Sequence, residues 1–198
     1  MADLSFSELI QQTWQLLRRG TVDTKSPFHS ASFVNYDGQR PQARQVILRD
    51  VDAKQAILTF HNDIRSAKVE QIRAYPQVSW LFWHPKQRIQ LRLNGVTVLH
   101  HLDQVSRSAW QDLAPSSRLN YSSQLPPGSA VESWAVGKKA QSSYEDLAKS
   151  SLEEWYPNFA VVQTRLSSFE YLQLRREGHL RAQFERQEDS WYGQWLVP

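Results

Sequence analysis

Two cations lie at the start of a predicted helix, where they could hold a phosphate group. Arg65 and Lys68 flank Ser66, and the apolar spacing that follows predicts a helix over residues 66–75. A helix N-terminus already carries partial positive charge and unpaired N–H groups, so each cation there costs about 0.3–1 kcal/mol without an anion. A bound dianion would offset that cost, and Ser66 could cap the helix or donate to the anion. The alternative is a solvated surface turn, because Lys and Arg are common on exposed helices.

A second candidate for ligand contact is the apolar, strand-like run between Arg44 and Arg49. Arginines five positions apart on a regular strand point to opposite faces. The two side chains could therefore serve two ends of one ligand. Alternatively, one could reach a ligand while the other pairs with Asp50 or Asp52.

Several kinds of site are excluded by composition and spacing. The seven glycines are too far apart for a P-loop or a dinucleotide-binding loop, so a phosphate would need side chains and a helix N-terminus. The absence of cysteine removes disulfides, thiolate metal ligands and a thiol nucleophile. His100 and His101 are adjacent on a predicted strand and point apart, so we expect no metal site.

Length and composition favour one soluble domain over residues 1–198. The chain is 40% hydrophobic and 22% charged, and it contains no apolar run typical of a secretion signal or a membrane span, so we expect a cytoplasmic protein. The net charge of +3 suits a phosphorylated ligand as well as a nucleic acid. The eight tryptophans lie mostly in apolar strands, which favours packing over base stacking, and we expect no nucleic-acid partner.

The elements that would position these residues are mainly antiparallel strands with peripheral helices, closing into a barrel or nearly so. The predicted helices cover residues 3–19 (with a capping box at Ser5 and Glu8, and Gly20 just past its end), 66–75, 103–113 and 143–154. The predicted strands cover residues 32–36, 45–51, 56–60, 78–83, 88–93, 96–100, 159–166, 169–174, 180–186 and 191–197. The long loop 116–137 could close over a ligand or cross a subunit interface.

These segments together resemble the pyridoxamine 5′-phosphate oxidase-like, FMN-binding split-barrel family. The matching stretches are residues 44–49, 60–68 and 78–83, Gln90 five residues before Gly95, and residues 157–159 and 191–198. The resemblance implies an antiparallel split β-barrel with peripheral helices and a homodimer with FMN at the subunit interface. It also implies an FMN-dependent oxidoreductase acting on a small molecule, without a membrane partner.

The resemblance also implies residue roles. Arg65, Ser66 and Lys68 would grip the FMN phosphate, and Gln90 would reach FMN from the polar face of its strand. His61 and Asn62 would flank the flavin ring, where the family has an aromatic residue and a threonine. The run along the flavin would comprise Arg44, Gln45, Val46, Ile47 and Leu48, and the substrate would contact Arg49, Arg118, His179 and Arg181. No catalytic protein residue is assigned, because the flavin carries out the redox chemistry.

The chain departs from the oxidase pattern in the predicted substrate pocket. His179 and Arg181 invert the oxidase order of arginine and histidine, and Gln183 stands where the oxidase has an arginine. Leu172 falls at a tryptophan position, and the tyrosine, arginine and serine that hold the substrate phosphate fall on Trp110, Ala114 and Arg118. We therefore expect FMN binding with an altered substrate. The alternatives are an authentic pyridoxamine or pyridoxine 5′-phosphate oxidase and a flavin carrier or sensor without turnover.

Overall fold

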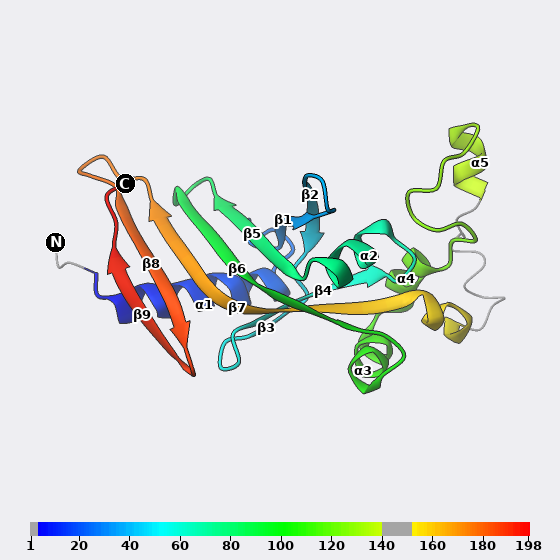
Figure 1. Cartoon of the computed structure of the whole chain (residues 1–198), viewed down its shortest axis with the longest axis horizontal. Coiled ribbons are helices and arrows are strands. Elements are labelled where there is room, and N and C mark those ends of the chain that lie inside the picture. Colours follow the sequence, from blue (N-terminus) through cyan, green and yellow to red (C-terminus); the bar gives the residue numbers. More distant parts are fainter. Residues whose placement is uncertain (1–3, 140–151) are drawn as a thin grey trace.

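The computed structural model describes residues 4–139 and 152–198, which form a curled, half-barrel antiparallel sheet with helices around it (Figure 1). The order of strands is β2-β1-β5-β6-β7-β4-β3, and β8 pairs with β7 and β9. The strands are β1 Ser30–Tyr36, β2 Pro41–Ile47, β3 Asp50–Asp52, β4 Ile57–Asp63, β5 Gln77–His84, β6 Ile89–His100, β7 Phe159–Gln173, β8 Leu180–Gln187 and β9 Ser190–Trp195. The helices are α1 Phe6–Val22, α2 Ala67–Ala74, α3 Gln104–Asp112, α4 Pro115–Arg118 and α5 Trp134–Lys139, with 3-10 turns η1 Leu119–Tyr121 and η3 Leu152–Asn158.

Two long strands, β6 and β7, run through the middle of the molecule where shorter strands were predicted (Figure 1). They pair along their length, with a register shift at Asn94 and Gly95. A Cβ atom on Gly95 would lie 2.2 Å from the carbonyl oxygen of Arg165. Glycine at this position therefore lets the two backbones approach without breaking either strand.

The capping box predicted for the first helix is confirmed, and its predicted end is wrong. The Ser5 side chain accepts from the Glu8 N–H, while the Glu8 carboxylate accepts from the Ser5 N–H. The helix continues through Gly20 to Val22. A Cβ atom on Gly20 would lie 2.3 Å from the carbonyl oxygen of Phe28, so this glycine serves close packing and does not end the helix.

The predicted strand 45–51 is interrupted in the structure. β2 ends at Ile47 and β3 starts at Asp50. Between them the Leu48 N–H donates to the carbonyl of His29, and the Leu48 side chain is fully buried. Leu48 continues the alternation of β2, so it is buried in the core on the same side as Val46.

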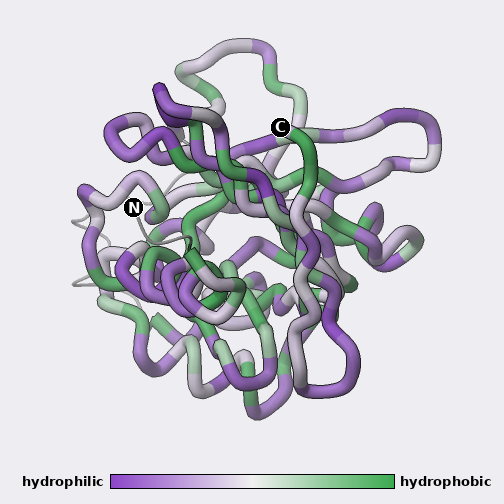
Figure 2. The backbone as a smooth tube through the Cα atoms, turned by 90° about the vertical axis from the view of Figure 1, so that its left-hand side faces the viewer, coloured by the Kyte–Doolittle hydropathy of each residue, from purple (hydrophilic) through white to green (hydrophobic). Residues whose placement is uncertain are grey.

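The core has two parts, and the tryptophans mainly pack in them. The larger part lies under the sheet and includes Phe33, Phe60 and Trp80, whose rings contact one another at 4.9–5.6 Å between centroids. The smaller part joins Trp110 of α3 to Phe159 of β7. Hydrophobic and hydrophilic residues alternate along several strands, as expected for a sheet with one buried face (Figure 2).

The region predicted as loop 116–137 contains short helical pieces, namely α4, η1 and α5. Most of the helix predicted over residues 143–154 lies outside the described residues, and its described end belongs to η3. In the described parts of the chain, no helix combines the length and apolar character needed to cross a membrane.

Candidate functional site

A cavity of about 650 Å³ lies between β2, β4, the start of α2 and residues 120–128. This volume falls within the range of small-molecule and cofactor sites. Eight of the eleven residues predicted to contact FMN line it, together with Arg49: they are Arg44, Gln45, Val46, Ile47, His61, Asn62, Ser66 and Lys68. The two runs that the sequence singled out therefore meet at one place.

Lys68 places a half-buried ammonium group in this cavity. Its Nζ donates to Asn62 Oδ1 at 2.5 Å and lies 5.2 Å from the centroid of the Phe60 ring. Within residues 4–139 and 152–198, no carboxylate lies within ion-pair distance of Lys68. Burial, with a smaller contribution from Arg44, lowers the pKa of Lys68 to about 8. The site thus holds a cation that lacks a counter-ion.

Arg44 is the second such cation. Its guanidinium donates to Asn35 Oδ1, and Asn35 in turn donates to Gln71 of α2 at 2.9 Å. Burial lowers the pKa of Arg44, and in the part of the chain that the structure describes it forms no ion pair. The one carboxylate that lines the cavity, Asp63, is bound by Arg65, so Lys68 and Arg44 are left to favour the binding of an anion there.

The start of α2 contributes hydrogen-bond donors. Ser66 is the N-cap residue by its backbone angles, but its side chain makes no capping hydrogen bond. Its hydroxyl oxygen accepts from Asn62 Nδ2 at 2.7 Å, which leaves the hydroxyl proton available to a ligand. The first-turn N–H groups of the helix and its dipole add to the attraction for a negative charge.

Arg65 differs from Lys68, although both stand at the same predicted helix start. Its guanidinium holds Asp63 with two contacts, Nη2 to Oδ2 at 2.7 Å and Nε to Oδ1 at 3.0 Å, and donates from Nη1 to the Ser123 carbonyl at 2.9 Å. These bonds raise the pKa of Arg65. Arg65 does not line the cavity. The structure therefore gives it an internal partner where the sequence suggested a phosphate contact.

Two other predicted cofactor residues also lie outside the cavity. Leu48 is fully buried in the core. Gln90 lies near the start of β6, opposite Trp83 on one side and Leu172 on the other. Within one chain, neither side chain reaches the residues around Lys68.

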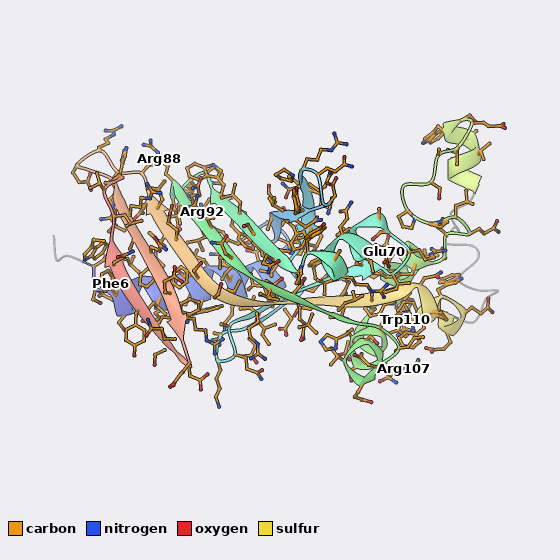
Figure 3. All side chains as sticks on the ribbon, viewed as in Figure 1. Phe6, Glu70, Arg88, Arg92, Arg107 and Trp110 are labelled. Carbon is orange, nitrogen blue, oxygen red and sulfur yellow. The ribbon has the colours of Figure 1, made fainter. Side chains whose placement is uncertain are left out.

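The other residues predicted to contact the substrate, Arg118, His179 and Arg181, do not line the cavity that Arg49 lines. Arg118 lies over the Trp110 ring at 5.1 Å and donates to the Gln111 carbonyl. Arg181 binds Glu170, the same carboxylate that Arg92 binds. Figure 3 shows Arg92 at the end of the molecule opposite Glu70, which belongs to α2.

His179 bonds only locally, at the backbone of Arg175, and does not line the cavity. The structure therefore does not bring His179 and Arg181 to the cavity within one chain.

His61 has an environment that sequence could not reveal. Its Nδ1 atom is buried and has no hydrogen-bond partner in the described structure. Burial, assisted by the positive charge of Arg49, lowers the pKa of His61 to about 4. The imidazole is therefore neutral at physiological pH, and its Nδ1 atom is enclosed by the protein without a hydrogen-bond partner among the described residues.

Sequence reasoning missed part of the lining, which comes from distant segments. Gln42 and Gln71 carry no local motif, and only the folded arrangement of β2 and α2 brings both to the cavity. Residues Asn120, Tyr121, Pro127 and Gly128 border it from the region between α4 and α5. The length of the loop was the one signal that pointed to this border.

Comparisons with known proteins match part of the chain to a family model. Residues 6–101 match the model of the pyridoxamine 5′-phosphate oxidase, FMN-binding domain. The pyridoxine/pyridoxamine 5′-phosphate oxidase of Prochlorococcus marinus is 28% identical over 180 residues, covering 82% of this chain and 72% of that protein. The enzyme of the same name from Microcystis aeruginosa is also 28% identical, over 172 residues, covering 80% of this chain and 73% of that protein.

Solved structures share the fold along almost the whole chain. A pyridoxamine 5′-phosphate oxidase-related, FMN-binding protein from Nostoc punctiforme superimposes with a TM-score of 0.76 at 22% identity and covers 99% of both chains. PhzG from Burkholderia lata, solved with tetrahydrophenazine-1-carboxylic acid, gives a TM-score of 0.75 at 17% identity and covers 100% of this chain and 99% of its own. The predicted split-barrel fold is confirmed.

The cavity fits the cofactor of this family. FMN carries a phosphate dianion, and the cavity offers Lys68 and Arg44, neither of which forms an ion pair in the described structure, beside a helix N-terminus. The β2 segment 45–47 supplies an apolar and amide surface next to these cations. Residues 6–101 of this chain are thus similar to the pyridoxamine 5′-phosphate oxidase, FMN-binding domain, and the whole chain shares the fold of related FMN-binding proteins.

Proposed function

We propose that this protein is an FMN-dependent oxidoreductase and that the 650 Å³ cavity holds FMN. One observation carries the assignment: Lys68 and Arg44 share the cavity with no carboxylate to neutralise them among the described residues. Lys68, Ser66 and the first turn of α2 would hold the phosphate. Arg44 and residues 45–47 would hold the rest of the cofactor, with His61 and Asn62 beside it.

The cofactor and the protein residues would have separate roles in this function. Bound FMN supplies the capacity to accept and pass on electrons. The chain anchors the phosphate through its cations and keeps His61 neutral as a hydrogen-bonding group at the cavity wall. Tyr121 borders the same cavity, and burial raises the pKa of its phenol, so it remains a protonated donor. No protein nucleophile is required.

The working unit that we propose is a homodimer. Leu81, Trp83, Val96 and Val98 are all more than a third exposed and lie on one face of β5 and β6. Exposed apolar side chains on this otherwise polar face favour association with another protein surface. Gln90 pairs with Trp83 across the strands and so shares that face. A second copy covering the face would bury Gln90 between the subunits.

The test begins with the colour of the purified protein. We expect a visible flavin spectrum and one FMN released per chain. Protein stripped of flavin should then bind FMN far more tightly than riboflavin, which has the same ring and no phosphate. Reduction of the bound flavin by a nicotinamide donor would establish redox activity. Equal affinity for FMN and riboflavin would contradict the phosphate site.

A second candidate activity is the oxidation of pyridoxamine or pyridoxine 5′-phosphate, because both curated relatives bear that name. Hydrogen peroxide production with either compound would support it. A protein that binds FMN but neither oxidises these compounds nor accepts electrons would instead be a flavin carrier or sensor. Sedimentation of the wild type and of Trp83→Asp tests the dimer, since a charge on the apolar face should release single chains.

A further inference from the structure

Asn35 is a polar residue at an inward-facing position of β1. Alternate residues of this strand are buried, and Asn35 follows Ala31 and Phe33 on the buried side. Ala31 and Phe33 pack in the larger part of the core, whereas Asn35, which is only 3% exposed, needs hydrogen-bond partners for its amide inside the protein. The identity of these partners therefore indicates why an amide stands at this position.

Arg44 and Gln71, which both line the proposed FMN cavity, are those partners. The Oδ1 atom of Asn35 accepts from the Arg44 guanidinium, and its Nδ2 atom donates to Oε1 of Gln71 at 2.9 Å. Arg44 pairs with Phe33 in the antiparallel register of β1 and β2, so it lies diagonally next to Asn35 on the same face. Gln71 comes three residues after Lys68 on the same side of α2. The row of Arg44, Asn35 and Gln71 thus joins β2 to the helix that carries Lys68.

The hydrogen bonds fix the orientation of the Asn35 amide. Because Gln71 Oε1 accepts, the NH2 group of Asn35 faces α2 and its oxygen faces Arg44. The reverse orientation would place two donors together at Arg44 and two oxygens together at Gln71. Gln71 therefore orients Asn35, and Asn35 holds the Arg44 guanidinium at the cavity wall. Arg44 is held close enough to Lys68 to help lower the pKa of Lys68, so the row keeps two like charges together.

Asn35 holds Arg44 without neutralising its charge. Beside the cavity, Arg65 is held by the carboxylate of Asp63, which balances its charge. Arg44 is held by a neutral amide and forms no ion pair among the described residues, so its positive charge stays available. An aspartate of the same shape at position 35 would remove one unit of positive charge from the cavity. The other charged or titratable residues of the lining are Arg49, His61, Asp63, Lys68 and Tyr121.

We propose that Asn35 is a positioning residue of the FMN site and sets the preference of that site for a phosphorylated ligand. Its oxygen, oriented by Gln71, holds the guanidinium of Arg44 at the cavity wall and leaves the positive charge uncompensated. The charge of Arg44 then adds to that of Lys68 in attracting the phosphate dianion. The inference rests on the proposed function, because it assigns Asn35 to the cavity that we propose for FMN.

The first experiment titrates flavin-free wild type and Asn35→Asp with FMN and with riboflavin, followed by quenching of flavin fluorescence. Aspartate has the shape of asparagine, and Gln71 can turn its amide to donate to the new carboxylate, so the row of hydrogen bonds is kept. We expect FMN affinity to fall about five- to tenfold, as for one charge neutralised near a dianion, and riboflavin affinity to stay the same. An unchanged ratio of FMN affinity to riboflavin affinity would overturn the proposal.

The ratio of the two affinities also guards against a folding defect, because a poorly folded variant would lose affinity for both ligands alike. Gln11→Glu makes the same change of charge at an exposed position of α1 and serves as the matched control. Its ratio of FMN affinity to riboflavin affinity should equal that of the wild type. A change in Gln11→Glu as large as that in Asn35→Asp would refute a local role for Asn35.

A double-mutant cycle tests whether Asn35 acts through Arg44. Asn35→Ala removes the hold on the guanidinium and adds no charge, so we expect it to weaken FMN binding about two- to threefold, less than Asn35→Asp does. In the Arg44→Met background, Asn35→Ala should leave FMN affinity unchanged. Equal losses in both backgrounds, or a loss in Asn35→Ala as large as that in Asn35→Asp, would contradict the positioning role.

The wild-type titration separates the two proposals. If the wild type prefers FMN to riboflavin and Asn35→Asp keeps that preference, the inference on Asn35 fails and the FMN assignment stands. If the wild type binds FMN no more tightly than riboflavin, the phosphate site itself fails, and the role of Asn35 fails with it.

Discussion

The two ends of the sheet treat their arginines and lysines in opposite ways. At the β8 end, the buried carboxylate of Glu170 accepts from Arg92 at 2.7 Å and from Arg181 at 3.1 Å. At the α2 end, Lys68 and Arg44 share a cavity with no acid of their own in the described structure. Both ends contain several cations, but only the α2 end has cations that lack an acidic partner in the described structure. An anion site is therefore indicated by cations without acidic partners, and the number of cations alone does not indicate one.

The largest expected effect tests the α2 end directly. Lys68→Met removes the cation and keeps much of the side-chain length. We expect FMN affinity to fall about 10- to 100-fold, as for loss of a charged hydrogen bond, when apo-protein is titrated by quenching of flavin fluorescence. Riboflavin affinity should stay nearly constant. A similar loss for both ligands would place the phosphate elsewhere.

The pH dependence of FMN affinity is a second test of the α2 end. The pKa of Lys68 in the free protein is lowered to about 8, and only the protonated amine attracts the phosphate. Affinity for FMN should therefore be fully present below pH 8 and fall as the pH rises above it, by up to about tenfold per pH unit. Titrations between pH 7 and 9.5 would show this slope. In Lys68→Met the slope should disappear; a slope that persists would assign the titration to another group.

At the β8 end the expected effect is on stability. Glu170→Gln leaves Arg92 and Arg181 without their shared carboxylate. Both guanidiniums are partly exposed, so we expect the free energy of unfolding to fall by only about 1–2 kcal/mol. Urea denaturation would measure it. An unchanged midpoint would mean that solvent already neutralises these arginines.

The smallest expected effect concerns Arg65, which stands beside the cavity but is internally paired. The double variant Asp63→Asn with Arg65→Gln removes both charges of the pair at once. We expect FMN affinity to stay within about threefold of the wild type, because no net charge is lost near the phosphate. A loss as large as that of Lys68→Met would show that Arg65 holds the phosphate after all.

The sequence predicted the structural features that depend on residues close together in the chain. The capping box at Ser5, the inward Val69 and Ile72 of α2, and the strand beside Arg44 all follow from local spacing, and the structure has each of them. The convergence of residues 44–47 with 61–68 also followed, through the family resemblance. These features need little information from the rest of the chain.

The features that the sequence did not predict depend on contacts between residues that are far apart in the chain. The position of Arg65 is fixed partly by the carbonyl of Ser123, and the Leu48 N–H beyond the end of β2 donates to the carbonyl of His29. No local pattern contains either partner. A smaller cavity of about 390 Å³ likewise needs α3 to lie against β4 and β7, so its lining could not be assembled from sequence spacing.

The close approach at Gly95 has a practical consequence for protein engineering. Even alanine at this position would place its methyl group 2.2 Å from the Arg165 carbonyl oxygen. The clash would fall between β6 and β7, the two long strands that connect the two ends of the sheet. Libraries that seek new ligand preferences should therefore leave this codon fixed. Variants with a substitution at Gly95 would fold poorly, so a selection would lose them even if their ligand binding had improved.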